Sequence, residues 1–578
     1  MIGTEHIRND IFRIWPEEAI NKKHEDDRKR VYLTPTRVLW KTDNSEAKVV
    51  NSDVLTEKRS PQISMEAKNP CIMVSQKGYA SVLLDFGREL HGGIVIFAWS
   101  DSTKRGAKVR IRFGESAMEA MSEIGGPENA TNDHANRDLI VRVGSMSMTP
   151  IGETGFRFVR IDLLEENQEL VLKAIQAVMI YKDLEYKGSF SCSDKLLDRI
   201  WDTGAYTAHL SMQNYIWDGI KRDRLLWAGD MHPETTTIQT VFGSDETVMR
   251  SLEFVKEETP LPGWMNGFPA YSMWWIIIQR DWFMHTGNLD YLEKQKEYLI
   301  GLEKQLSEAI DENGKDCTPE VRFIDWPTLE DKEVVDCGLQ ALHVMAVKSL
   351  GYMLDILGEK KLAQKCSEDI KRLSKWKGNY KQAKQAAALS VLAGLENART
   401  VNEKLLKVGK SEGLSTFMGY YILNARAMAG DIDGCLECIR EYWGGMLSLG
   451  ATTFWEDFDV KWLKNAAPID EIIEKNSEKI NVHACYGKYC YKGYRHSLCH
   501  GWASGVTAWI TENILGVKIL EPGCKKIKIQ PQLGNLQWAK GTYPTPYGIL
   551  VVEHRKDAEG KIKTDVKAPK EIEVIVEI

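Results

Sequence analysis

The chain has 578 residues, of which 43% are hydrophobic and 27% are charged, and its formal net charge is −7. This length allows several domains with sizeable cores, and the composition is that of a globular protein rather than a disordered chain. The acidic balance offers no basic footprint for nucleic acid. The aromatic-rich apolar stretch Met273–Ile278 is far shorter than the ~18 residues of a membrane span, so we expect no membrane partner.

Two features predict a cytoplasmic protein. The first ten residues, MIGTEHIRND, contain no apolar segment of the kind found in secretory leaders. The 11 cysteines are odd in number and scattered, which is typical of reduced thiols rather than of a disulfide framework. Cys435 and Cys438 form a CxxC pattern inside a helical run, where we expect both to pack in a core.

Residues 1–185 predict β-structure. Residues 80–99, 107–116, 155–164 and 170–181 alternate apolar and polar side chains or carry glycines at turns. Many short strands separated by turn signals are typical of a β-sandwich of the jelly-roll kind.

Residues 186–515 predict helices, beginning after Ser193, which we expect to be a helix N-cap. Pairs of helical segments follow, one pair joined by a short turn near Gly358. No fixed-period repeat is present, which disfavours an open solenoid and leaves a closed helical barrel. Residues 516–578 return to strand patterns and predict a small C-terminal β-sandwich. The predicted fold class is therefore multidomain α+β.

A short stretch, WDGIKRDRLLWAGDMHPE from Trp217 to Glu234, combines three aspartates, four basic side chains and two tryptophans. Opposite charges lower the pKa of a carboxyl group and burial raises it, so such a cluster of charged and apolar side chains can hold carboxyls in different protonation states. Acid–base catalysis needs that difference. The alternative is a solvated charged loop.

This stretch resembles the signature of glycoside hydrolase family 78, the α-L-rhamnosidases. In that family an acidic residue, a basic–acidic–basic triplet and a Trp-x-Gly-Asp follow at this spacing. Further segments are similar in the same order, and the resemblance spans roughly residues 80–555. The further similar segments are GFPAYSMWWIIIQRDWFMHTGN (267–288), FIDWPT (323–328), GATTFWEDFD (450–459) and CHGWASG (499–505).

The resemblance implies an (α/α)6 barrel flanked by N-terminal and C-terminal β-sandwich domains. It also implies exo-acting hydrolysis, with inversion, that releases terminal α-L-rhamnose or a closely related deoxy sugar. Inverting hydrolysis uses two carboxyl groups about 6.5–9.5 Å apart, one as acid and one as base. By the match, Asp223 is the acid and Glu456 is the base.

The resemblance also places substrate-contacting residues. Asp218 and Asp230 would hold sugar hydroxyls, Arg222 would keep one of them ionised, and His500 would contact the sugar or orient the base. Asp325 lies in the matching segment FIDWPT and is also expected to contact the substrate.

Tryptophan supports a carbohydrate site independently, since the chain has 18 Trp against 15 Phe and sugar C–H faces pack on large rings. We expect Trp326 and Trp455, beside candidate carboxyls, to be site walls, and Trp227 to contact substrate.

One position departs from the family pattern, because members commonly carry Glu where this chain has Asp223. For Asp223 to act as the acid, Arg222 and Arg224 must both turn away from it. A polar insertion, residues 465–493, is expected at the pocket rim.

Other functions stay open: a catalytically impaired glycan-binding homologue, the same barrel acting on another sugar, or phosphate in place of water. A homodimer also stays open. The expected partner is a rhamnosyl glycoside or oligosaccharide.

No cofactor is expected. A group of His and Cys side chains between residues 483 and 500 matches no standard zinc spacing. The group consists of His483, Cys485, Cys490, His496 and His500.

Overall fold

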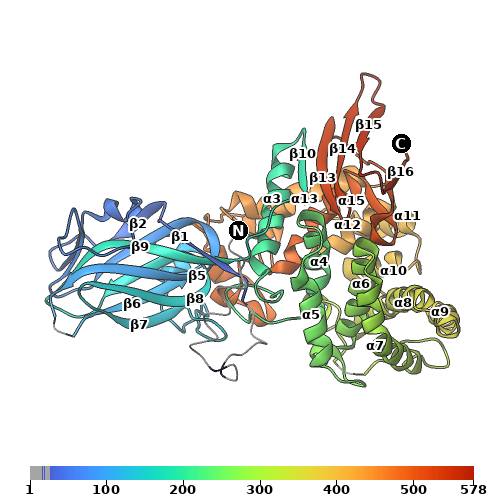
Figure 1. Cartoon of the computed structure of the whole chain (residues 1–578), viewed down its shortest axis with the longest axis horizontal. Coiled ribbons are helices and arrows are strands. Elements are labelled where there is room, and N and C mark those ends of the chain that lie inside the picture. The colour runs from blue at the N-terminus through green and yellow to red at the C-terminus, as the bar shows by residue number, and fades with distance from the viewer. Residues whose placement is uncertain (1–15, 17–18, 20–25, 104, 320, 475) are drawn as a thin grey trace.

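The structure is a computed structural model that describes residues 16, 19, 26–103, 105–319, 321–474 and 476–578. Strands of the N-terminal part lie at one end, helices follow, and the C-terminal strands lie against the helices (Figure 1). The first ten residues, on which the expectation about a secretory leader rests, lie outside the described residues. Among the helices that are described, none is both long and apolar enough for a membrane span.

The N-terminal strands form one nine-stranded antiparallel sheet in the order β3-β4-β9-β5-β8-β6-β7, with β1 on β9 and β2 on β5. The long strand β5 lies between β8 and β9 and pairs antiparallel with each of them, and both pairings contain register shifts. Alternate side chains of one face enclose an apolar core of their own. The strands are β1 Lys29–Leu33, β2 Arg37–Lys41, β3 Ala47–Val50, β4 Cys71–Ser75, β5 Ala80–Asp101, β6 Ala107–Gly114, β7 Asp138–Val143, β8 Ser147–Leu163 and β9 Gln168–Tyr181.

Six helices contact one another in a closed ring: α4, α6, α8, α10, α12 and α15, with α15 returning to α4. The helices α3, α7, α9 and α13 pack against members of this ring. The ring helices are α4 Met231–Val241, α6 Pro269–Thr286, α8 Lys332–Ile356, α10 Lys384–Leu392, α12 Gly419–Met428 and α15 Gly505–Asn513. The others are α2 Ala117–Met121, α3 Lys195–Ser211, α5 Glu246–Glu257, α7 Leu289–Glu308, α9 Lys360–Leu373, α11 Ala398–Val401, α13 Ile432–Ser448 and α14 Val482–Cys485.

Two local predictions have different outcomes. The turn near Gly358 is confirmed: Gly358 lies between α8 and α9 with a φ of 81°, which a residue without Cβ adopts freely. Ser193 as the helix cap is wrong, because Asp194 accepts the Leu196 N–H and caps α3. Ser193 instead accepts the backbone N–H of Gln537.

The C-terminal strands form a four-stranded sheet, β10-β13-β14-β15, and a three-stranded sheet, β11-β12-β16. Strand β10, Ser189–Cys192, precedes the helices in the chain and pairs with β13, so this segment is a strand although it lies in the range predicted to be helical. The apolar side chains of these strands join the core of the helices. The other strands are β11 Val517–Glu521, β12 Lys526–Ile529, β13 Trp538–Thr545, β14 Gly548–Lys556, β15 Ile562–Lys567 and β16 Glu573–Val576.

All 11 cysteines lie in described residues and are free thiols. Cys435 and Cys438 lie on α13 and are fully buried, as the packing prediction requires. The Sγ of Cys438 accepts a hydrogen bond from Arg426 at 2.9 Å.

Candidate active site

The predicted site residues gather at one end of the helix ring, where its helices begin. Asp230 directly precedes α4, Asp325 precedes α8, and His500 precedes the short 3-10 turn that leads into α15. Tyr271 lies in the first turn of α6. Helix N-termini carry partial positive charge, so this end of the ring suits carboxylates.

The stretch from Trp217 to Asp230 is an irregular loop between α3 and α4. Asp218 closes this loop on itself, because its carboxyl accepts the Leu225 N–H at 2.9 Å and its N–H donates to the Leu225 carbonyl. Burial raises the pKa of Asp218 to about 8. Asp218 is therefore predominantly neutral at pH 7 and organises the loop.

Lys221 anchors the loop to the N-terminal domain. Its ammonium lies 2.9 Å from Glu115 and 3.2 Å from Glu119, and it also donates to the carbonyls of Tyr494 and His496. Lys221 is 3% exposed and both glutamates are fully buried. The position of the triplet that follows Lys221 thus depends on a buried ion cluster shared between domains.

Arg222 joins the two predicted catalytic carboxyls. Its Nη1 donates to Asp223 at 2.9 Å and its Nη2 donates to Glu456 at 2.8 Å, while its Nε donates to the Arg495 carbonyl. Asp223 and Glu456, which the sequence predicts to be the catalytic pair, thus contact the same guanidinium, and Arg222 lies between them. The requirement that both arginines turn away is met only by Arg224, which donates to the Glu153 carbonyl.

Glu456 is buried and strongly hydrogen-bonded. One oxygen accepts from Arg222 and the other accepts the Ser497 N–H at 3.0 Å. Burial pushes the pKa of Glu456 upward, but Arg222, His500 and His496 together hold it below the usual range. Glu456 is therefore ionised at neutral pH, as a general base must be.

Asp223 is held in an uncommon backbone conformation. Its φ is 59° and that of Arg224 is 56°, a left-handed region that side chains with a Cβ seldom adopt. Such strain persists where surrounding contacts over-determine it and is frequent at functional sites. The nearby Leu225 is 49% exposed, whereas the Asp223 side chain is 16% exposed.

Asp230 and His500 form a buried pair, with His500 Nε2 at 3.2 Å from the Asp230 carboxyl. Burial raises the pKa of Asp230. Burial also opposes charge on His500, but the nearby Asp230 and Glu456 raise its pKa above the usual value. His500 is therefore hydrogen-bonded to the carboxyl at the start of α4 and lies close enough to Glu456 for that charge to raise its pKa.

Asp325 has a structural role in this conformation. Its carboxyl accepts the Trp326 N–H and the Ser415 hydroxyl, the latter at 2.6 Å, and so links the segments that precede α8 and α12. Burial raises the pKa of Asp325 to about 7.

The three tryptophans named from the sequence have different surroundings. Trp326 is half-buried and stacks on Tyr489 of the polar insertion, with ring centroids 5.9 Å apart, which places the insertion against the site as expected. Trp227 is half-buried and meets the rings of Phe268 and Tyr271 edge-on. Trp455 as a site wall is wrong: it is 1% exposed, so it lies in the core and presents no face to a substrate.

His134 belongs to the site, although nothing in the sequence singled it out. It lies on the loop between α2 and β7 of the N-terminal domain, and its Nδ1 lies 2.5 Å from the Asp223 carboxyl. Long-range contacts of this kind, 89 residues apart in sequence, carry no signal in a single sequence.

One group of possible metal ligands among the described residues includes His483 together with two glutamates that the sequence did not single out. Glu115, Glu119 and His483 place possible ligand atoms within 4.8 Å of one another. The ammonium of Lys221 contacts both glutamates, and the guanidinium of Arg137 lies 3.7 Å from Glu119. Both ring nitrogens of His483 are engaged, with Ser116 and with the His496 carbonyl. This donor set is therefore satisfied by the protein.

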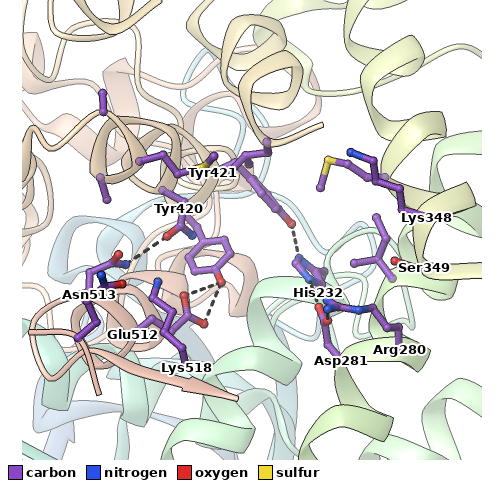
Figure 2. A pocket seen from close by; sticks show the side chains of 18 of the residues that line it. His232, Arg280, Asp281, Lys348, Ser349, Tyr420, Tyr421, Glu512, Asn513 and Lys518 are labelled. Carbon is purple, nitrogen blue, oxygen red and sulfur yellow. Dashed lines mark hydrogen bonds and ion pairs between the residues drawn. The ribbon is translucent and has the colours of Figure 1, made fainter. Parts of the chain in front are cut away.

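A cavity of about 910 Å³ lies toward the opposite end of the ring helices (Figure 2). It reaches the last residues of α12 and α15 and is polar, with Tyr420 bonded to Glu512 and Tyr421 bonded to His232. His232 stacks on both Trp274 and Tyr421, and those two rings also contact each other with centroids 4.8 Å apart. Neither Asp223 nor Glu456 lines this cavity, so it is separate from the site above.

Comparisons with known proteins agree with this architecture. Residues 185–514, more than half of the chain, match the bacterial alpha-L-rhamnosidase 6 hairpin glycosidase domain, and residues 516–578 match the bacterial alpha-L-rhamnosidase C-terminal domain. An alpha-L-rhamnosidase of Alteromonas sp. (strain LOR) is 22% identical over 90% of this chain and 58% of its own length.

Solved structures share the fold. The GH78 family rhamnosidase of Bacillus sp. GL1 is 23% identical with a TM-score of 0.71, covering 88% of this chain and 54% of that one. A rhamnosidase from Klebsiella oxytoca with rhamnose bound is 18% identical with a TM-score of 0.65, covering 84% of this chain and 96% of that one. The chain thus spans little more than half of the Alteromonas and Bacillus proteins. On the domain matches and the motifs of the site, the chain belongs to the bacterial α-L-rhamnosidases of glycoside hydrolase family 78.

Proposed function

We propose that this chain is an exo-acting, inverting glycoside hydrolase that releases terminal α-L-rhamnose, or a closely related deoxy sugar, from glycosides or oligosaccharides. The observation that carries the proposal is the bridge from Asp223 through Arg222 to Glu456. Inverting hydrolysis uses two carboxyl groups about 6.5–9.5 Å apart. The shared contact with Arg222 keeps Asp223 and Glu456 near one another without direct contact, which supports their assignment as such a pair. The closed ring of six helices supports assigning an (α/α)6 barrel.

In this mechanism Glu456 takes a proton from water, which attacks the anomeric carbon while the glycosidic oxygen leaves on the opposite face. The low pKa of Glu456 keeps the base ionised before the reaction. The proton for the leaving oxygen comes from a group at the end of Arg222 that contacts Asp223. In this proposal Asp230 and His500, which form a buried hydrogen-bonded pair, bind sugar hydroxyls.

The direct test is hydrolysis of an aryl α-L-rhamnoside followed by proton NMR. We expect turnover, with the β-anomer of rhamnose formed first and mutarotation following. Initial release of the α-anomer would exclude inversion. Saturable rhamnose binding without turnover would favour the second candidate, a glycan-binding homologue, which the Arg222–Asp223 contact supports. Turnover of glycosides of another deoxy sugar, without turnover of rhamnosides, would show that the substrate is that other sugar.

The pH profile tests the role assigned to Glu456. A base must be deprotonated, so kcat/KM for an activated aryl rhamnoside is lost as pH falls through the pKa of Glu456, which lies below the usual range of a glutamate. Arg222→Met removes a neighbouring cation, so we expect this acidic limb to move up by about 1–3 pH units. Arg222→Lys should keep much of the shift. Arg224→Met is the matched control, and an equal displacement of its limb would contradict the assignment.

We also propose a cytoplasmic location, which the free thiols support. The three predicted regions, residues 1–185, 186–515 and 516–578, remain our proposed domains, with strand β10 assigned to the last of them.

A further inference from the structure

The cavity of about 910 Å³ drawn in Figure 2 has no part in the proposed reaction, yet it has the size of a small-molecule site. Side chains of the ring helices α6, α8, α12 and α15 line it, together with Lys518 of strand β11 and two glutamines that follow β12. The cavity therefore lies where the helix ring meets the C-terminal strands, and ligand sites occur preferentially between domains.

Cationic side chains outnumber acidic ones in the described lining of this cavity. The cations are Arg280, Lys348, Arg399 and Lys518, and the acids are Asp281 and Glu512. Even with both carboxyls ionised, the lining carries an excess of two positive charges.

Both acidic side chains already have partners within the protein. Asp281 accepts a hydrogen bond from Arg280 at 2.8 Å and lies 3.2 Å from Nε2 of His232. The Tyr420 hydroxyl lies 3.1 and 3.0 Å from the two oxygens of Glu512, and burial raises the pKa of Glu512. The carboxyls of the lining thus leave its three other cations without a counter-charge.

Those cations are Lys348, Arg399 and Lys518, and in the part of the chain that the structure describes none of them forms an ion pair with a carboxylate. Lys348 donates to the Ala393 carbonyl at 2.6 Å, and partial burial lowers its pKa. Lys348 and Lys518 lie on different sides of the cavity (Figure 2). An ammonium that loses water without gaining a counter-charge favours an anionic ligand.

The uncharged polar lining suits hydroxyl groups. Ser349 is 6% exposed, and among the described residues its hydroxyl has no hydrogen-bond partner, so it is available to a molecule in the cavity. Asn513 donates its amide hydrogens to Asn424 and to the Trp509 carbonyl, which leaves its amide oxygen to accept. A sugar hydroxyl both donates and accepts, so free hydroxyl and amide groups complement it.

We propose that this cavity binds a small hydroxylated anion, either a sugar acid or a sugar phosphate. The lysines of its two sides attract the anionic group, and Ser349 and Asn513 bind hydroxyls. Neither Asp223 nor Glu456 lines the cavity, so the inference does not rest on the proposed hydrolytic function.

Calorimetric titration of the full chain tests this site with three probes that share one sugar ring: D-glucuronate, glucose 6-phosphate and neutral D-glucose. We expect at least one of the two anions to bind, and D-glucose to bind far more weakly. The tighter anion shows whether the site prefers a carboxylate or a phosphate.

Two pairs of substitutions locate the bound anion. Lys348→Met combined with Lys518→Met should weaken binding of the tighter anion about 10–100-fold, the usual effect of losing a hydrogen bond to a charged group. Lys371→Met combined with Lys567→Met removes two exposed lysines that do not line the cavity and should bind like the wild type. Circular dichroism checks that both double variants are folded.

Competition separates this site from the candidate active site. Excess L-rhamnose should leave the titration unchanged, and inorganic phosphate should bind more weakly than glucose 6-phosphate. Displacement by L-rhamnose would place the probe in the candidate active site and overturn the inference. Phosphate binding as tight as that of glucose 6-phosphate would mean an adventitious ion only. Absence of binding by both sugar anions, or equal affinities in the two double variants, would also overturn it.

Discussion

Glu456→Gln should lower kcat for an aryl α-L-rhamnoside by about 10²–10⁴-fold and leave rhamnose binding nearly unchanged. The amide keeps the shape of the side chain and can still accept from Ser497, but it cannot take a proton from water. Removal of the base leaves proton donation to the leaving group unchanged. Azide, a nucleophile that needs no base, should therefore restore release and give a rhamnosyl azide of inverted configuration. Steady-state kinetics and NMR of the product measure both effects.

Two comparisons make this result specific. Glu474→Gln changes an exposed carboxyl on the polar insertion and should leave kcat near that of the wild type. Asp457→Asn removes the adjacent carboxyl, whose pKa burial raises to about 7. If Asp457→Asn lost turnover and Glu456→Gln kept it, the base would be Asp457, and the assignment of Glu456 would be wrong.

Lys221→Met should destabilise the protein by about 3–5 kcal/mol, the usual result of removing one partner from a buried ion cluster. The substitution leaves Glu115 and Glu119 fully buried without the ammonium that contacts both. Burial already raises the pKa of Glu115 to about 7, and loss of the cation raises it further. Protonated carboxyls need no counter-charge, so the deficit should shrink as pH is lowered.

The matched control is Lys195→Met, which removes an exposed lysine that pairs with Asp198 on the surface. Exposed ion pairs contribute about 0–1 kcal/mol, so its thermal midpoint should stay close to that of the wild type. Midpoints measured by circular dichroism at several pH values separate the two variants. Equal midpoints for Lys221→Met and Lys195→Met would show that the cluster does not hold the domains together.

Local patterns in the sequence were sufficient for most secondary structure. The strands of the N-terminal part follow from a periodicity of two residues, and the turn at Gly358 follows from a glycine between two helical patterns, so both need only neighbours in sequence. Strand β10 escaped this kind of inference because four residues, Ser189–Cys192, form a strand only by pairing with β13, some 350 residues later in the chain.

The features of the candidate site also divide into those that the sequence indicates and those that only the structure shows. The motif around Asp223 and the segment around Glu456 could be found from their residue types and order, because a short charged stretch and a resemblance need no coordinates. The surroundings of each side chain could not. Trp326 and Trp455 both adjoin a carboxyl residue in sequence, yet one stacks on Tyr489 and the other is 1% exposed.

By itself, the sequence determined the family, the order of strand-rich and helix-rich regions, and the pair of carboxyls. Only the tertiary structure decided that Arg222 bridges those carboxyls, that Lys221 is clamped by Glu115 and Glu119, and that His134 reaches Asp223. The physical reason is that protonation and hydrogen bonding depend on burial and on charges within a few ångströms. Those neighbours come from different domains, and a periodicity or a motif reports only on residues that are close along the chain.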